Sequence, residues 1–385
     1  MDRDVLLISF STILFYTVIG ASNIGLQTLF NGRIPDSWIA FFTIANWVPL
    51  LLMSPLWGRL ADKYDRETLV IAIATIISAI IFFLHSILID FSQAIILRAF
   101  FGFFTAAFLP ITTALLLRGI ESRKAGERAA IFNLSRSLGF LFSGYFATLV
   151  LYLFSVLSIF QLGFVILLLS ALSILSLSKT SINRFPEAAP KRSSLFPGKD
   201  FISRNNGHLL IIALAIRHAN IMGINSIIFV YMIRKGIPDY LTGAISSFNM
   251  LVQIILMYPL GKLSDRIGRK PLFMTGFILS AIFPLIFIIA DTPILFSIAF
   301  LVIGLSFSAL ISGATPFLKD IAPEGREGEA LSFLNISRGI GAVLGPLLTS
   351  LIIDKIGYTV LFLTFTIITI FATLLAVFVK ETLKN

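Results

Sequence analysis

The stretch Gly261-Lys262-Leu263-Ser264-Asp265-Arg266-Ile267-Gly268-Arg269-Lys270 has an earlier copy in the same chain, Gly58-Arg59-Leu60-Ala61-Asp62-Lys63-Tyr64-Asp65-Arg66. Three more matches follow in the same order at an offset of about 202 positions: Gly102 with Gly304, Gly126-Glu127 with Gly328-Glu329, and Asn133 to Gly139 with Asn335 to Gly341. Four ordered matches at one offset indicate that the chain consists of two homologous halves.

Long apolar runs surround both copies. The chain has 385 residues, of which 57% are hydrophobic and only 13% are charged, which is too little charge for the surface of a soluble protein. A membrane-spanning helix needs about 20 apolar residues. Cutting the sequence at charged residues, Pro and Gly predicts twelve such helices, at 5–30, 37–57, 68–89, 92–118, 128–153, 157–178, 207–233, 239–260, 271–290, 293–318, 328–352 and 357–379. We therefore expect an all-α membrane protein with twelve transmembrane helices in two pseudo-symmetric six-helix bundles.

The positions of polar and basic residues predict the domain organisation and the orientation. The longest polar stretch, 179–206, separates a bundle at 1–178 from a bundle at 207–385. Of the thirty Lys and Arg residues, twenty-two fall on the side of the N-terminus, four fall in the opposite loops and four fall within helices. Cytoplasmic loops are enriched in Lys and Arg. We therefore expect a multi-pass protein of the cell membrane with both termini and the 179–206 linker in the cytoplasm.

In its repeated stretches the chain resembles the major facilitator superfamily, and the resemblance extends over essentially its whole length. The stretch from Gly261 to Lys270 fits the family's loop signature at every position, and the copy from Gly58 to Arg66 departs from it only where Asp65 replaces a glycine. Arg98-Ala-Phe-Phe-Gly102 is similar to an element of the family's fourth helix that is often seen in proton-coupled exporters. The resemblance implies alternating access, with a solute site between the halves near the membrane midplane.

One element of the resemblance argues against a drug/proton antiporter. The stretch Gly341-Ala-Val-Leu-Gly345-Pro346 resembles an exporter element that is diagnostic in the fifth helix, but here it lies in the predicted eleventh. The fifth helix has Gly139 and Gly144 without a proline. Gly341, Gly345 and Pro346 permit tight helix contact and a kink, so they serve either a gate or plain packing.

The loop signatures predict a gate. We expect Gly58 and Gly261 to end helices and to allow close backbone approach. Carboxylates at the membrane rim can accept hydrogen bonds from a helix N-terminus or from loop arginines. A network of this kind can form in one conformation and break in another, and its predicted charged members are Asp62, Arg66, Asp265 and Arg269. The alternative is a solvated loop that only sets the topology.

Buried polar residues predict a solute site. A buried arginine costs at least ~2.5–3.5 kcal/mol at the centre of a helix, and all twenty Asp and Glu residues fall in loops, in the tail or at helix ends. A cavity with fixed positive charge attracts anions. The candidate solute-binding residues are Arg98, Arg217, His218, Asn220, Asn225, Asn23, Gln27, Arg136 and Arg338. The alternative for Arg136 and Arg338 is that they cap backbone carbonyls.

The sequence also argues against several kinds of chemistry. It has no cysteine, no metal-ligand pattern, no nucleophile–base set and no phosphate-binding loop of the Walker type. We therefore expect a transporter rather than an enzyme, without cofactor or metal, acting as a monomer in the lipid bilayer on a small molecule and not on nucleic acid. Protons are the candidate coupling ion, with His218 as candidate carrier. The leading hypothesis is an exporter; an importer or exchanger of organic anions and a non-transporting receptor or scaffold are the alternatives.

Overall fold

A computed structural model describes residues 3–64, 66–87, 90–117, 122–177, 202–323 and 326–383. These residues form helices joined by short turns, and the described ranges contain no strand. The chain divides into two compact units. Unit 1 consists of Met1–Ala188 with Pro238–Ser247, and unit 2 consists of Ala189–Ile237 with Phe248–Asn385.

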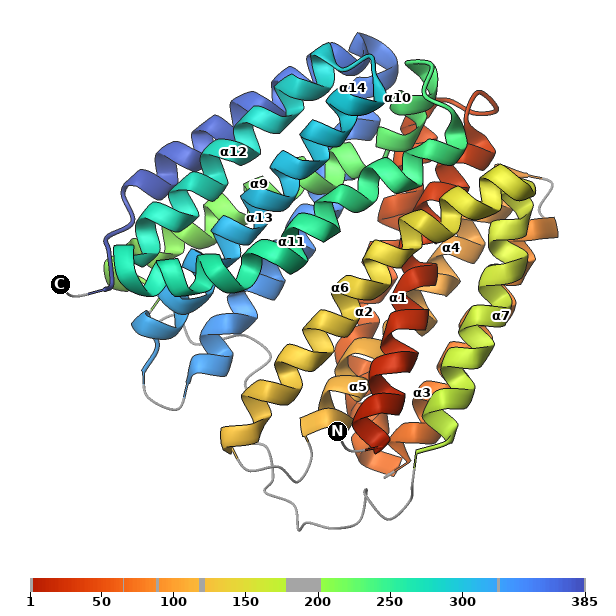
Figure 1. Ribbon diagram of the computed structural model, residues 1–385, viewed down its shortest axis with the longest axis horizontal. Helices are drawn as coiled ribbons and strands as arrows, with labels where there is room; N and C mark the ends of the chain where they lie inside the picture. Colours follow the sequence, from red (N-terminus) through yellow and green to blue (C-terminus); the bar gives the residue numbers. More distant parts are fainter. Residues whose placement is uncertain are drawn as a thin grey trace. The chain divides into compact units, whose positions relative to one another are not determined.

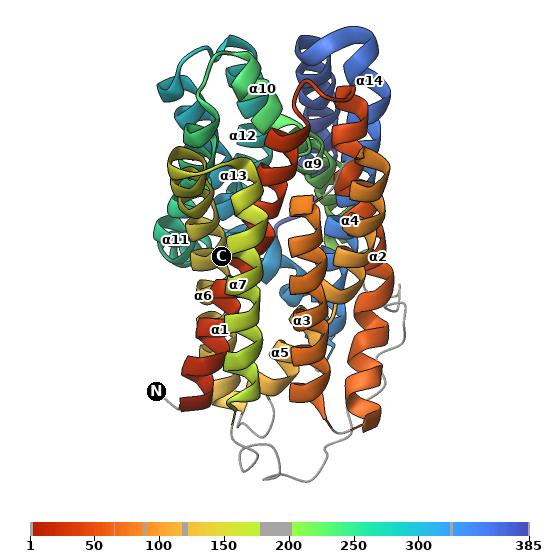
Figure 2. The ribbon, with the colours of Figure 1, turned by 90° about the vertical axis from the view of Figure 1, so that its right-hand side faces the viewer.

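Unit 1 is built from seven of the described α-helices: α1 (Arg3–Phe30), α2 (Asp36–Tyr64), α3 (Glu67–Leu84), α4 (Phe91–Thr105), α5 (Phe108–Leu117), α6 (Ser122–Leu153) and α7 (Val156–Leu175). Within it, α1 packs against α6 and α7, α2 packs against α4, and α3 packs against α7 (Figures 1 and 2). Small residues such as Ala72, Ala79 and Ser78 are buried on α3, because small side chains let helix backbones approach closely in a membrane.

Unit 2 contains α9 (Gly207–Asn225), α10 (Ile228–Arg234), most of α11 (Asp239–Ile267), α12 (Arg269–Ile289), α13 (Pro293–Ile321) and α14 (Glu327–Val377). In this unit α14 packs against α9 and α12, and α12 packs against α13 (Figure 1). Phe273, Phe277 and Phe317 are buried in one hydrophobic cluster that these helices share. The high Phe content of the sequence therefore serves, in part, the core of this unit.

The predicted membrane helices correspond to the observed ones. The described chain has eleven helices that are long and apolar enough to cross a membrane. The longest of them, α14, is interrupted at Gly357, whose φ of 80° and ψ of 177° are not helical. Its two parts correspond to the predicted helices 328–352 and 357–379, so the all-α membrane fold is confirmed.

Two predicted helices are broken in the structure. The predicted helix 92–118 is divided into α4 and α5, and the predicted helix 207–233 is divided into α9 and α10. The predicted boundaries between domains stay a prediction, because residues 178–201 of the linker lie outside the described residues. Residues 204–206 form a single 3-10 turn before α9.

Candidate functional site

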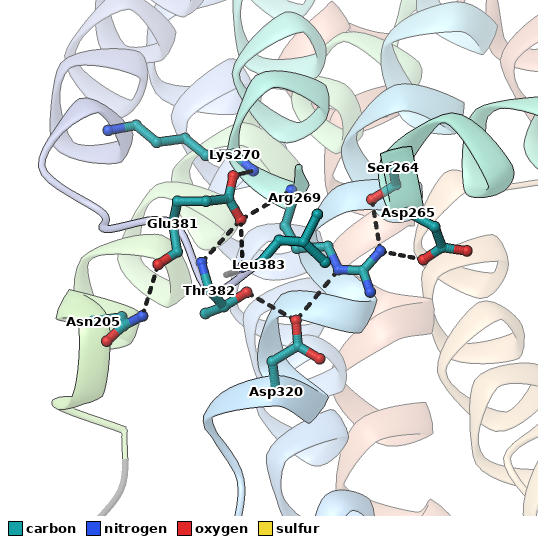
Figure 3. Close-up of polar contacts among 9 residues, drawn as sticks. All are labelled: Asn205, Ser264, Asp265, Arg269, Lys270, Asp320, Glu381, Thr382 and Leu383. Carbon is teal, nitrogen blue, oxygen red and sulfur yellow. Dashed lines mark hydrogen bonds and ion pairs between the residues drawn. The ribbon is translucent and has the colours of Figure 1, made fainter. Parts of the chain in front are cut away.

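The signature stretch of unit 2 forms a polar cluster where α11, α12 and α13 end or begin (Figure 3). Arg269, the first residue of α12, forms ion pairs with Asp265 of α11 and with Asp320 of α13, the latter at 3.3 Å. Its Nη1 also donates to Ser264 Oγ at 3.3 Å. One guanidinium group therefore joins three helices, through a planar set of donors that can serve several acceptors at once.

Glu381, beyond the end of α14, completes this cluster. Its carboxylate accepts from the backbone N–H groups of Arg269 at 3.0 Å and Lys270 at 2.8 Å, which begin α12. It also accepts from the N–H groups of Thr382 and Leu383. Burial raises the pKa of Glu381, but these backbone donors outweigh it and hold the pKa below its usual range. Glu381 thus acts as an acidic cap for the N-terminus of α12.

Gly268 makes this cap possible. It precedes α12 with a φ of 105°, a conformation that side-chain-bearing residues rarely adopt. A Cβ at this position would also lie only 2.6 Å from Glu381 Oε2. In unit 1 the corresponding residue is Asp65, which lies outside the described residues, as do the side chains of Asp62 and Lys63. Of the predicted gate residues of that copy, Arg66 precedes α3 and is exposed.

The segment that follows α14 is held along its length. Asn205 donates through Nδ2 to the carbonyl of Glu381 at 3.0 Å and accepts from the N–H of Lys380 at 3.0 Å. Thr382 Oγ1 donates to Asp320 at 2.8 Å, and Lys270 Nζ donates to the carbonyl of Val377 at 2.6 Å. The segment therefore connects the start of α9, the start of α12 and the end of α13.

The two signature glycines differ from the sequence-based expectation. We expected Gly58 and Gly261 to end helices, but α2 continues to Tyr64 and α11 continues to Ile267. The expectation failed because the polar residues that follow extend these helices beyond their apolar parts. A Cβ on Gly261 would meet nothing within 4 Å, and one on Gly58 would meet only Pro110, at 3.9 Å. Neither glycine is needed for packing against the described residues.

Gly341 and Gly345 of α14 have the opposite surroundings. A Cβ on Gly341 would collide with His218, and one on Gly345 would collide with the backbone of Ala219 and Gly223, all on α9. Pro346 follows within the same helix. These contacts are those of close helix packing, and a role of this stretch in gating stays a prediction.

Arg217 lies in the core of unit 2, with 1% of its surface exposed. Its Nε donates to Ser280 Oγ at 3.0 Å and its Nη2 donates to Ser306 Oγ at 3.4 Å, on α12 and α13 respectively. Its guanidinium carbon lies 5.5 Å from the ring centroid of Phe307. Among the described residues no carboxylate pairs with Arg217, so its partners are hydroxyl groups and an aromatic ring.

Arg338 approaches the same ring from α14. Its guanidinium carbon lies 5.9 Å from the centroid of Phe307. Arg338 and Phe307 are half-buried, whereas Arg217 is fully buried. We call Arg217, Phe307 and Arg338 the arginine–phenylalanine group. It places two positive charges near one ring, and Arg338 and Phe307 are its partly accessible members.

Asn220 and His218 surround this group on α9. Asn220 donates to the Ser280 carbonyl at 2.9 Å and to Thr369 Oγ1 at 2.8 Å. His218 Nδ1 lies 2.8 Å from the carbonyl of Leu214, which can only accept, so Nδ1 carries the hydrogen. His218 Nε2 and Asn220 Oδ1 are buried atoms for which no described residue is a hydrogen-bond partner. Asn225 is half-buried at the end of the same helix.

Unit 1 holds its arginines in separate places. Arg98 is buried, donates to Ser22 Oγ at 2.9 Å and lies 5.5 Å from the ring centroid of Phe101. In the described part of the chain its Nε has no hydrogen-bond partner. Arg136 is half-buried beside Tyr16, 5.8 Å from the ring centroid. The predicted polar pair of α1 consists of a half-buried Asn23 and a buried Gln27.

Sequence reasoning missed the two residues that complete these clusters. Glu381 follows the last apolar run, and no pattern in the sequence indicates that it returns to the start of α12. Phe307 is one of 38 phenylalanines, and nothing in its local sequence distinguishes it. The described residues contain no group of three or more His, Cys, Asp or Glu side chains that could hold a metal ion.

Comparison with known families agrees with this architecture. The sequence model described as Major Facilitator Superfamily matches residues 5–248 and, as a second match, residues 210–384. The chain belongs to the Major Facilitator Superfamily. It is therefore a multi-pass membrane transporter of a small molecule and not an enzyme.

Relatives within the Major Facilitator Superfamily include proteins named as efflux pumps. The multi-drug resistance efflux pump PmrA of Streptococcus pneumoniae is 26% identical over 321 residues, covering 81% of this chain and 78% of PmrA. The multidrug resistance protein MdtG of Dickeya zeae is 24% identical over 373 residues, covering 92% of this chain and 86% of MdtG.

Solved structures share the superfamily fold. The nucleoside transporter NupG superimposes with a TM-score of 0.79 at 16% identity, covering 98% of each chain. A bacterial homologue of the human lysosomal transporter Spinster, in an inward-facing and occupied conformation, superimposes with a TM-score of 0.75 at 14% identity, covering 97% of this chain and 95% of that one.

Proposed function

We propose that this transporter exports a small organic solute that carries an anionic or strongly hydrogen-bond-accepting group. The observation that carries this proposal is the arginine–phenylalanine group of unit 2, where Arg217 is buried without a carboxylate partner among the described residues. A buried charge is costly unless it is compensated. A solute that supplies negative charge beside Arg338 would compensate the buried charge of Arg217 and would gain affinity from doing so.

The three residues of the group have different roles in this proposal. Arg338 is half-buried, so it contacts the acidic or acceptor group of the solute directly. Phe307 offers its ring to an apolar part of the same solute. Arg217 lies behind the ring and acts through its charge, while Ser280 and Ser306 hold its orientation. Arg98 and Arg136 are the corresponding candidates in unit 1.

Export is supported by the relatives that are named as multidrug efflux pumps. Protons are the coupling ion that we propose, with both termini and the linker in the cytoplasm, as the Lys and Arg bias predicts. His218 is the proton-carrier candidate. A proton on its Nε2 would add a third positive charge beside Arg217 and Arg338. Electrostatic repulsion therefore disfavours protonation of His218 while no anionic solute is bound.

Transport by purified protein in liposomes tests the proposal. A panel of carboxylate, phosphate and permanently cationic solutes is measured with and without a pH gradient, in wild type, Arg338→Gln and, as a control, Arg33→Gln in the exposed turn between α1 and α2. We expect anionic solutes to compete best, and Arg338→Gln to weaken them by about tenfold or more, which corresponds to a lost charged hydrogen bond of about 1.5–3 kcal/mol.

Three outcomes would contradict the proposal. If permanently cationic solutes compete best and Arg338→Gln leaves their ranking unchanged, the anion site is wrong and a cationic-drug exporter is the better interpretation. If anionic solutes are carried inward or exchanged one for one, the protein is an organic-anion importer or exchanger. Absence of any transport by folded protein would favour a receptor or scaffold.

A further inference from the structure

A shallow apolar pocket lies on unit 1 where α2 meets α4, away from the arginine–phenylalanine group. It has a volume of about 360 Å³ and is lined by Met53, Leu56, Trp57, Arg59, Leu60 and Phe103. The indole Nε1 of Trp57 donates to the carbonyl of Phe103 at 2.8 Å, so this side chain is fixed between the two helices. Among the described residues of the lining, Arg59 is the single charged one.

The length and composition of α2 predict that Arg59 lies at the depth of lipid head groups. The apolar span of α2 ends at Ala61, so Arg59 belongs to the last turn of the membrane-spanning part. Leu56 and Leu52, one and two turns further into the membrane, are 50% and 62% exposed. Arg59 is itself exposed, and among the described side chains none forms an ion pair or hydrogen bond with it.

The internal repeat supplies a built-in comparison. Lys262 occupies the position of Arg59 in the second copy, and its Nζ lies 4.6 Å from the ring centroid of Tyr258, four residues earlier on α11. A cation over an aromatic ring is stabilised by the charge distribution of the ring. In unit 1 the residue four positions before Arg59 is Pro55, which offers no ring. The cation of unit 1 therefore lacks the partner that its counterpart has.

We propose that this pocket binds an anionic phospholipid. The phosphodiester lies at Arg59, and the upper part of one acyl chain lies along Leu56, Trp57 and Met53. An apolar slot with one cation that no described side chain pairs matches this ligand, because its described lining offers one positive charge for the phosphate and no polar group for the chain. A zwitterionic lipid fits less well, since its own cation would lie close to Arg59.

Trp57 can report on the occupant directly. The sequence has three tryptophans, Trp38, Trp47 and Trp57, so a Trp38→Phe/Trp47→Phe variant leaves one indole in the pocket wall. This variant is reconstituted in phosphatidylcholine vesicles that contain a rising mole fraction of one brominated lipid. The brominated lipid is either phosphatidylglycerol or phosphatidylcholine, and both carry the bromine on their acyl chains. Bromine quenches indole fluorescence only on contact. We expect brominated phosphatidylglycerol to reach half-maximal quenching at a mole fraction several-fold lower than brominated phosphatidylcholine.

Substitutions at the two repeat positions complete the test. Arg59→Gln should abolish the preference for phosphatidylglycerol, Arg59→Lys should retain most of it, and Lys262→Gln should leave it unchanged. Equal quenching by both lipids, or a preference that survives Arg59→Gln, would overturn the proposal. Absence of quenching by either lipid would also overturn it, because it would mean that protein covers the pocket. None of these readouts depends on transport.

Discussion

Glu381 is a single acidic side chain on which four backbone N–H groups converge. Because its pKa lies below the ordinary value, its charged form stabilises unit 2 at every pH above about 4.3. That stabilisation is lost as the pH falls through the lowered pKa. We therefore expect Glu381→Gln to lower the unfolding temperature at pH 7 by about 2–4 °C, as expected for about 1 kcal/mol.

The pH dependence separates this cap from an ordinary surface charge. As the pH falls below about 4.3, the unfolding temperatures of wild type and Glu381→Gln should converge, since wild type alone loses the charged cap. Thermal unfolding of the detergent-solubilised proteins measures this, with Asp291→Asn in an exposed turn as control. A constant difference between wild type and Glu381→Gln from pH 7 to pH 3 would show that the cap makes no charge-dependent contribution.

Arg217 and Arg338 should respond differently to the same conservative change. Arg217 uses two separate nitrogens for Ser280 and Ser306, and lysine lacks the planar guanidinium that makes these two bonds and lies beside the Phe307 ring. We expect Arg217→Lys to cost about 1–3 kcal/mol of stability and Arg338→Lys to alter mainly the competition among anionic solutes. Thermal unfolding and liposome competition, measured side by side, distinguish the two. Equal losses in both assays for both variants would remove the distinction between a contacting and a supporting arginine.

Packing of α9 against α14 depends on glycine. A methyl group on Gly345 would collide with the backbone of Ala219 and Gly223, so the two helices would have to separate. We expect Gly345→Ala to destabilise the protein by about 1–3 kcal/mol, in the range measured for overpacked cores. Gly328→Ala in the same helix is the matched control, because nothing lies within 4 Å of the added group. Equal stability of the two variants, from thermal unfolding, would show that α9 and α14 tolerate separation.

Apolar runs predicted where helices occur but not where they break. The division between α4 and α5 follows Thr105 within a continuous apolar run, so no change in composition marks it. Helical periodicity placed Arg217 and Asn220 on one face, and both do contact Ser280. It could not show that this face is directed toward α12, because periodicity describes one helix without its neighbours. Glu381 was missed for the same reason, since its partners are distant in sequence.

The orientation of the whole molecule in the membrane is predicted from charge rather than from fold. Twenty-two of the thirty Lys and Arg residues fall on the predicted cytoplasmic side. The chain has no cysteine, so single introduced cysteines report topology without background. We expect Asp291→Cys to react with an impermeant maleimide on intact cells, and Ser193→Cys to react only after the cells are permeabilised. Reaction of Ser193→Cys on intact cells would reverse the orientation.

The cap of α12 has a consequence for biosynthesis. Glu381 is translated 112 residues after Arg269, whose N–H it accepts. At about 5–20 residues per second, a ribosome needs about 6–22 s to cover that interval. During this time the first turn of α12 has only water or lipid phosphates to satisfy its N–H groups. The start of α12 therefore reaches its final state late in synthesis, after the helices that surround it have entered the membrane.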